Sequence, residues 1–191
     1  MAIPGGQFTT EPQVSDFIYP YNVAYTALHQ TVLGGIAPND ASQGRNYQLW
    51  SIDYDGTDIT VTPESGSTTL TITEPDVQSV SLSFNNNMDY VIAWTTPTGA
   101  KLYYYDTLTS QYITRTAEFT NITSCRVCVD KYEEWFAADS DVIFGYVENG
   151  NLYYRQQRDR YDNAYLIGPA TGRRLIKMAP SVGNRLQFQL I

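Results

Sequence analysis

DVIFGYVENGNLYYR, residues 141–155, contains the clearest structural pattern of the sequence. Two runs rich in β-branched and aromatic residues, Val142–Val147 and Leu152–Arg155, flank the tetrapeptide ENGN. The Asn149-Gly150 pair suits a type I′ turn, because that turn needs a positive φ at both central positions and Asn and Gly adopt it easily. The stretch therefore predicts a tight antiparallel β-hairpin.

The same pattern occurs about fifty residues earlier. The segment DYVIAWTTPTGAKLYYY, residues 89–105, repeats the paired apolar residues, the turn glycine and the Leu-Tyr-Tyr run. A looser third copy, YQLWSIDY at residues 47–54, turns at Asp55-Gly56 into another strand-like run. Hairpins repeated at this spacing are typical of β-propeller blades or of a sandwich, and a closed propeller needs at least four blades. We therefore expect an all-β fold of antiparallel hairpin repeats, either a partial propeller or a sandwich.

Alternation of apolar and polar residues extends the β prediction along the chain. Thr68–Thr73, Val77–Phe84 and the final RLQFQLI, residues 185–191, all alternate, which is typical of half-buried antiparallel strands. Asn22–Leu33 is the one helix candidate, because Asn22 can cap its start and Gly34-Gly35 can end it.

The first residues predict an extended arm. Pro4, Pro12 and Pro20 interrupt any helix there. We therefore divide the chain into an extended arm at residues 1–21 and a single mainly β domain at residues 22–191. The arm carries enough apolar side chains to need a surface, either on a neighbouring chain or on its own domain.

Bulk properties restrict the class of protein. A chain of 191 residues with 42% hydrophobic residues can bury a sizeable core in one domain. No window approaches the roughly 18 apolar residues of a membrane span. The start lacks the basic and apolar regions of a secretory signal. The sequence thus predicts a soluble protein that is made and folded in a cytoplasm.

The net charge of −8 hides an uneven distribution. Residues 1–100 hold one basic residue against ten acidic ones, residues 101–150 hold four against eight, and residues 151–191 hold seven against two. An acidic chain is a poor candidate for direct nucleic-acid binding, which depends on neutralising phosphates. The oppositely charged ends are expected to meet, either within one monomer or between stacked copies.

The cysteines, the histidine and the acidic clusters do not form a recognisable catalytic or metal-binding motif. Cys125 and Cys128 form a CxxC, but a zinc site needs four ligands and a strand would direct the two thiols to opposite faces, so we expect buried, inert thiols. The only histidine, His29, has no evident nucleophile in the sequence. The Asp53–Asp58 acidic cluster lacks the spacing of a calcium loop. We expect no enzyme activity and no metal or other cofactor.

Several segments resemble virion structural proteins of tailed bacteriophages. They are the Pro/Gly-rich start, the Ser/Thr/Asn-rich strands, the hairpins VIAWTTPTGAKLYYY and VIFGYVENGNLYYRQQRDRYDNAYL, and the ending RLQFQLI. The likeness is to tail, baseplate and fibre-attachment components. The resemblance implies a non-enzymatic subunit that assembles with itself, as a ring or trimer, and with other virion proteins. It also implies a location in the virion, which is assembled in the host cytoplasm.

The expected interface combines the apolar arm, docked on a neighbouring chain, with the basic C-terminal third, facing an acidic partner. Its candidate residues are Ile3, Phe8, Phe17, Tyr19, Arg155, Arg158, Arg160, Arg173 and Arg174. The alternative function is a carbohydrate- or host-receptor-binding β module, in which Trp50, Trp94 and Trp135 stack on sugars. A small hydrolase on a partial propeller is the third hypothesis, and the sequence offers it no convincing nucleophile or base.

Overall fold

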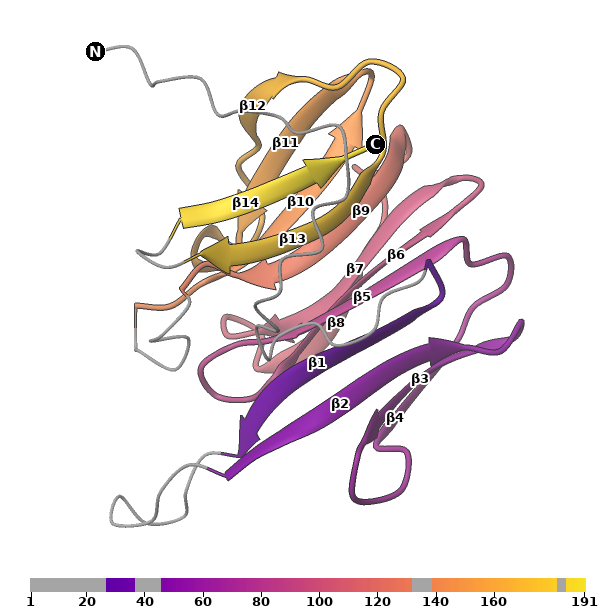
Figure 1. Cartoon of the computed structure of the whole chain (residues 1–191), viewed down its shortest axis with the longest axis vertical. Helices are drawn as coiled ribbons and strands as arrows, with labels where there is room; N and C mark the ends of the chain where they lie inside the picture. The colour runs from indigo at the N-terminus through magenta and orange to yellow at the C-terminus, as the bar shows by residue number, and fades with distance from the viewer. Residues whose placement is uncertain (1–26, 37–45, 132–138, 182–184) are drawn as a thin grey trace.

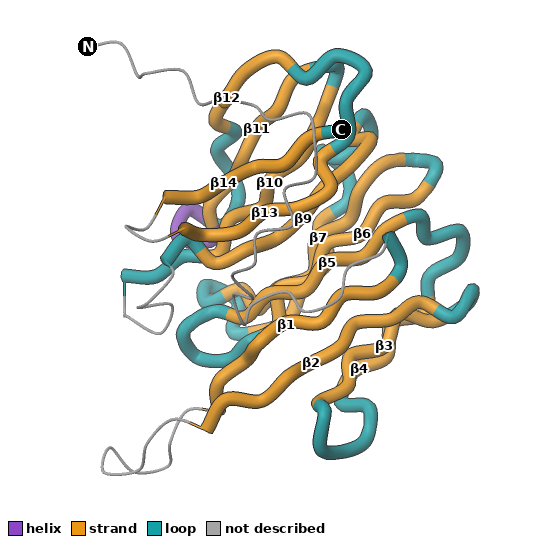
Figure 2. The backbone as a smooth tube through the Cα atoms, viewed as in Figure 1, coloured by secondary structure: helices purple, strands orange, loops and turns teal. Residues whose placement is uncertain are grey.

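The computed structural model describes residues 27–36, 46–131, 139–181 and 185–191. These residues form 14 strands in four antiparallel sheets, which confirms the all-β prediction (Figure 1). The one helical element among them is a short 3₁₀ turn, η1 (Gln157–Asp159), as Figure 2 shows. No helix in this part of the chain is long and apolar enough to cross a membrane.

The first three sheets are four-stranded meanders and the fourth has two strands. The first sheet contains β1 (His29–Ile36), β2 (Asn46–Tyr54), β3 (Asp58–Pro63) and β4 (Leu70–Thr73). The second contains β5 (Ser79–Phe84), β6 (Tyr90–Thr96), β7 (Gly99–Asp106) and β8 (Gln111–Arg115). The third contains β9 (Ile122–Val129), β10 (Val142–Glu148), β11 (Asn151–Gln156) and β12 (Tyr165–Pro169). The fourth contains β13 (Leu175–Ser181) and β14 (Arg185–Leu190).

The hairpin repeat of the sequence is the central strand pair of each complete sheet. The three copies form β2–β3, β6–β7 and β10–β11, all antiparallel. Asn149 and Gly150 have φ values of 49° and 75°, as the predicted type I′ turn requires. Gly99 has a φ of 133°, and a Cβ there would lie 2.3 Å from the Phe119 carbonyl oxygen, so this position needs glycine.

The sheets stack face to face, and three apolar clusters fill the spaces between consecutive sheets. Strand β6 shows the pattern: Ile92 and Trp94 pack toward the first sheet, whereas Val91 and Ala93 pack toward the third. Strand β10 divides in the same way between the second and fourth sheets. Both faces of these strands are covered, so their burial is continuous even though successive side chains alternate in direction.

The first strands of successive sheets lie side by side, as in propeller blades (Figure 1). Ala27, two residues before β1, accepts a hydrogen bond from the Val80 N–H of β5 at 2.8 Å. Strands β5 and β9 are joined by the Ser81 hydroxyl, which accepts from the Val127 N–H at 3.1 Å. The Ser124 hydroxyl of β9 accepts from the Leu175 N–H of β13 at 2.8 Å. The arrangement is that of the partial propeller, the first of the two architectures expected from the sequence.

The helix prediction at Asn22–Leu33 is wrong wherever the structure describes it, because residues 29–33 belong to β1. Val32 and Gln30 on one face are buried against the second sheet, and pairing with β2 satisfies the main chain. Tertiary pairing thus overrides a local pattern that fitted a short helix. The expected arm at residues 1–21 and the cap at Asn22 lie outside the described residues.

Candidate functional site

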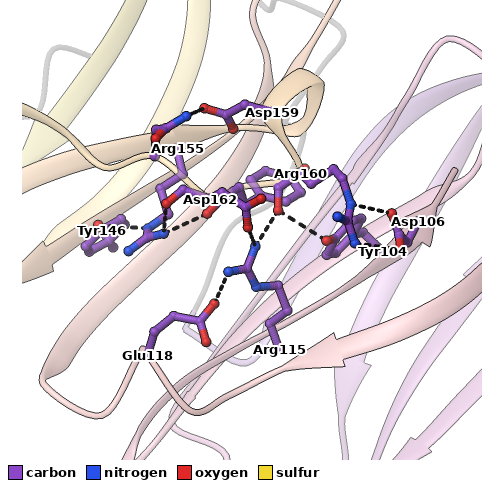
Figure 3. Close-up of polar contacts among 11 residues, drawn as sticks. Tyr104, Asp106, Arg115, Glu118, Tyr146, Arg155, Asp159, Arg160 and Asp162 are labelled. Carbon is purple, nitrogen blue, oxygen red and sulfur yellow. Dashed lines mark hydrogen bonds and ion pairs between the residues drawn. The ribbon is translucent and has the colours of Figure 1, made fainter. Parts of the chain in front are cut away.

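Charged and aromatic side chains gather where the second and third sheets meet, and we call this group the interblade joint. Figure 3 shows the polar contacts of the joint. Its members are Tyr104, Asp106, Arg115, Glu118, Phe119, Tyr146, Arg155, Arg160, Tyr161 and Asp162.

The link between Asp106 and Arg160 is bidentate. Nε and Nη2 of Arg160 donate to the two carboxylate oxygens of Asp106 at 2.8 and 2.9 Å. Asp106 closes the end of β7 and is 1% exposed. The Arg160 guanidinium lowers the pKa of this carboxyl to about 2. The pair therefore stays ionised at neutral pH and ties the turn after η1 to the second sheet.

Two further arginines hold the main chain of the same turn. Arg115 donates to the Arg160 carbonyl and, at 2.9 Å, to the Asp162 carboxylate, and it also pairs with Glu118. Arg155 donates to the carbonyls of Tyr161 and Asp162 at 2.7 and 2.9 Å. Arg160 and Tyr161 have φ values of 59° and 61°, a left-handed conformation uncommon for non-glycine residues. The arginine contacts satisfy the carbonyl groups that this turn presents.

Aromatic rings form the floor of the joint. Phe119, which follows β8, is 0% exposed, and its ring centre lies 5.2 Å from that of Phe144. The guanidinium carbons of Arg115 and Arg155 lie 5.9 and 5.4 Å from the Phe119 ring centre. Burial raises the pKa of the Tyr161 hydroxyl well above its ordinary value. These groups hold the second and third sheets together. The raised pKa keeps the Tyr161 hydroxyl protonated, so it is not activated as a nucleophile.

Arg158 makes a second link, within the third sheet. Its Nε donates to Asp141 at 2.6 Å, and Nη2 lies 3.4 Å from Asp130. Arg155, Arg158 and Arg160, expected from the sequence to face a partner, thus bind groups of their own chain. The basic C-terminal region thus meets acidic residues from the middle of the chain within one monomer, whereas the expected meeting of the two chain ends is not tested by these contacts. The contacts join residues 106–141 with residues 155–162.

The cysteines are buried, as expected. Cys125 packs between the second and third sheets and Cys128 between the third and fourth, so the two thiols point to opposite faces of β9. Burial raises the pKa of Cys128 to about 12 and that of Cys125 further still. Neither thiol is available as a thiolate at neutral pH.

His29 has partners that the sequence did not indicate. Its Nδ1 lies 2.5 Å from Asp53 Oδ1, and the Thr31 hydroxyl lies 3.2 Å from Nε2. The order hydroxyl–imidazole–carboxylate is that of a catalytic triad. However, the three residues lie on the outer face of the first sheet, where the β1–β2 ladder uses the main-chain donors that an oxyanion hole would need. We interpret the contact as a cross-strand polar pair.

The remaining acidic cluster also has a structural role. Asp55 accepts the main-chain N–H groups of Thr57 and Asp58 at 2.9 and 2.8 Å, which closes the β2–β3 turn and lowers the pKa of its carboxyl. Within the described ranges, no group of three or more His, Cys, Asp or Glu residues is placed to hold a metal ion.

The tryptophans do not form a sugar-stacking platform in the described part of the chain. Trp94 is 1% exposed in the core between the first two sheets, so its proposed stacking role is wrong. Trp50 is partly buried and packs against Phe84 at 5.2 Å between ring centres. Trp135 lies outside the described residues, as do the arm residues Ile3, Phe8, Phe17 and Tyr19. Arg173 and Arg174 are exposed in the turn before β13.

The outer edge of the third sheet is apolar and exposed. On β12, Tyr165, Leu166 and Ile167 are 38%, 62% and 42% exposed. The outer strands of the other complete sheets read LTIT in β4 and QYITR in β8. The arginine of β8 discourages pairing with other chains, whereas β12 has no charged residue. The protections of β12 are a bulge at Ile167 and Pro169 at its end.

Comparison of the chain with protein-family models, with curated protein sequences and with solved structures finds no match.

Proposed function

We propose that this chain is a non-enzymatic structural subunit of a tailed-bacteriophage virion, in or near the tail. It assembles with copies of itself and with other virion proteins, in particles that form in the host cytoplasm. The observation that carries the assembly role is the exposed apolar edge strand β12. The phage assignment rests on the sequence resemblance of the hairpins and of the Pro/Gly-rich start.

An exposed apolar edge is a liability for a protein that works alone, because its free N–H and C=O groups and its side chains can pair with another chain. In the described part of the chain, β12 pairs with β11 only. A neighbouring subunit that pairs with β12 would bury this edge and form an interface by strand addition. Arg173, exposed in the turn between β12 and β13, lies close to it in the chain and favours an acidic partner surface.

The rest of the described structure fits a rigid structural subunit. The interblade joint uses its ionised groups to hold two sheets together, and the thiols are buried. A rigid stack of sheets keeps its surfaces in fixed relative positions, which a subunit of a symmetric assembly requires.

The test is complementation with a matched pair of variants. Cells that express wild type, Leu166→Asp or Leu108→Asp are infected with phage whose own copy of the gene is deleted. Leu166 is 62% exposed on β12 and Leu108 is 73% exposed in the β7–β8 turn, so both substitutions remove an exposed leucine. We expect wild type and L108D to yield complete particles and L166D to yield none, at unchanged thermal stability. Equal particle yields for L166D and wild type would refute the interface.

A further inference from the structure

A cavity of about 320 Å³ lies where the first strands of the sheets run side by side (Figure 1). Its lining includes Ala27, two residues before β1, Ser79 at the start of β5, Ser124 on β9 and Leu175 at the start of β13. The cavity therefore exists only because the sheets stack on one another. Pockets that bind small molecules begin at about 300 Å³, so this one is large enough for a small ligand.

Two arginines line this cavity at different depths. Arg126, on β9, is 5% exposed, whereas Arg174, just before β13, is exposed. Burial and the charge of Arg174 lower the pKa of Arg126 to about 10, so both guanidinium groups are charged at neutral pH and repel each other. An anion bound beside both of them offsets this repulsion.

The position of Arg126 is fixed by main-chain groups. Its Nε donates to the Ile176 carbonyl of β13 at 3.0 Å, and its Nη1 donates to the Cys125 carbonyl at 2.8 Å. Carbonyl groups carry no net charge, so these contacts orient the guanidinium without neutralising it. A group that is oriented before the ligand arrives loses less conformational entropy on binding.

Hydroxyl groups and apolar side chains complete the lining. The Ser124 hydroxyl accepts from the Leu175 N–H at 2.8 Å and can still donate its own O–H, and Ser79 supplies a second hydroxyl. Leu175, Ile176 and Ile191 supply apolar atoms. A ligand that matches this lining has an oxyanion at one end and a small apolar group at the other.

We propose that this cavity binds a small organic anion, a carboxylate or a phosphate monoester, with its charged group at Arg126 and Arg174 and its apolar part against Ile176 and Ile191. Arginine binds both kinds of oxyanion through paired N–H donors, which is the chemistry that they share. The net charge of −8 on the whole chain opposes unspecific attraction of anions, so binding depends on these two local charges. Such a site goes beyond the proposed virion role and does not depend on it.

Calorimetric titration of the full-length protein with benzoate, phenyl phosphate and benzyl alcohol tests the proposal. The first two probes carry the two candidate anionic groups on the same ring, and the third is uncharged. We expect saturable binding of at least one anion, at one molecule per chain, and no binding of benzyl alcohol at the same concentrations. The tighter of the two anions identifies the preferred charged group.

A matched pair of variants locates the binding. Arg174→Gln removes the exposed charge of the site and should weaken binding about tenfold or more. Arg173→Gln removes the neighbouring exposed arginine, which does not line the cavity, and should leave the affinity unchanged. Arg126→Lys keeps the buried charge but loses the planar pair of donors, so it should also weaken binding about tenfold. If this variant does not fold, the NMR signal of the Arg126 Nε–H in the wild-type protein should shift as the anion is added.

Four results would overturn the proposal. The first is no saturable binding of either anion up to about 10 mM. The second is equal affinity for benzyl alcohol, which would mean that the cavity selects apolar groups and not charge. The third is wild-type affinity in R174Q, which would place the anion elsewhere. The fourth is the same loss of affinity in R173Q and R174Q, which would mean that the anion responds to the general charge of the turn.

Discussion

Phe119 is the residue on which the interblade joint depends most. Its side chain is fully buried, packs on Phe144 and lies beneath the guanidinium groups of Arg115 and Arg155. Removal of a buried phenylalanine ring costs about 3–5 kcal/mol of folding free energy. Loss of the two cation–π contacts adds about 0.5–1 kcal/mol each. Phe119→Ala should therefore destabilise the protein by about 4–7 kcal/mol.

Calorimetry measures this effect directly. For a chain of this size, 1 kcal/mol corresponds to about 2–4 °C in Tm, so Phe119→Ala should lower Tm by about 8–28 °C. Phe119→Leu keeps most of the apolar volume and loses only the ring, so we expect a loss of about 1–2 kcal/mol. Leu108→Ala, on an exposed turn residue, is the control and should leave Tm unchanged. A loss below about 1 kcal/mol for Phe119→Ala would refute the central position of this ring.

The other predictions concern packing, pH and thiol reactivity. A Cβ at Gly145 would lie 2.4 Å from Met178 Sδ, so Gly145→Val should cost about 1–3 kcal/mol by urea unfolding, and Met178→Ala should recover part of it. The pKa of Asp106 is about 2 in the folded protein and about 3.9 when unfolded, so its contribution to stability is present above pH 4 and is lost as the pH falls toward 2. Asp106→Asn should flatten the stability curve in that window; an unchanged curve would contradict the ion pair. Cys125 and Cys128 should react with a thiol reagent only after denaturation, and rapid labelling of the native protein would contradict their burial.

The sequence predicted local β structure well, because alternation and turn residues act over short distances. ENGN identified the β10–β11 hairpin, and the repeat identified the central pair of each complete sheet. Strands β12 and β13 were not predicted. The β12 sequence, YLIGP, does not alternate, and β13 contains Pro180 and a register shift near Lys177. Their strand character comes from pairing with neighbours.

The interblade joint could be predicted only as a tendency. The opposite charges of the two chain ends indicated that the basic C-terminal region would meet acidic residues, but the acidic residues of the joint come from the middle of the chain. The partners themselves could not be assigned, because Asp106 and Arg160 are 54 positions apart and meet only when two sheets stack. The central position of Phe119 could not be predicted from the sequence, because an isolated phenylalanine between strands can take many positions. The wrong helix prediction at residues 29–33 has the same origin, because these residues become strand β1 by pairing with β2.

The proposed virion role is tested most directly by immunogold electron microscopy. Antibodies raised against the purified chain are applied to tailed particles from a culture that expresses it, with particles lacking the gene as the control. The account predicts gold label at the tail of wild-type particles and none on the control. Purified particles free of the protein, with the chain recovered only from the soluble fraction of the cells, would contradict it.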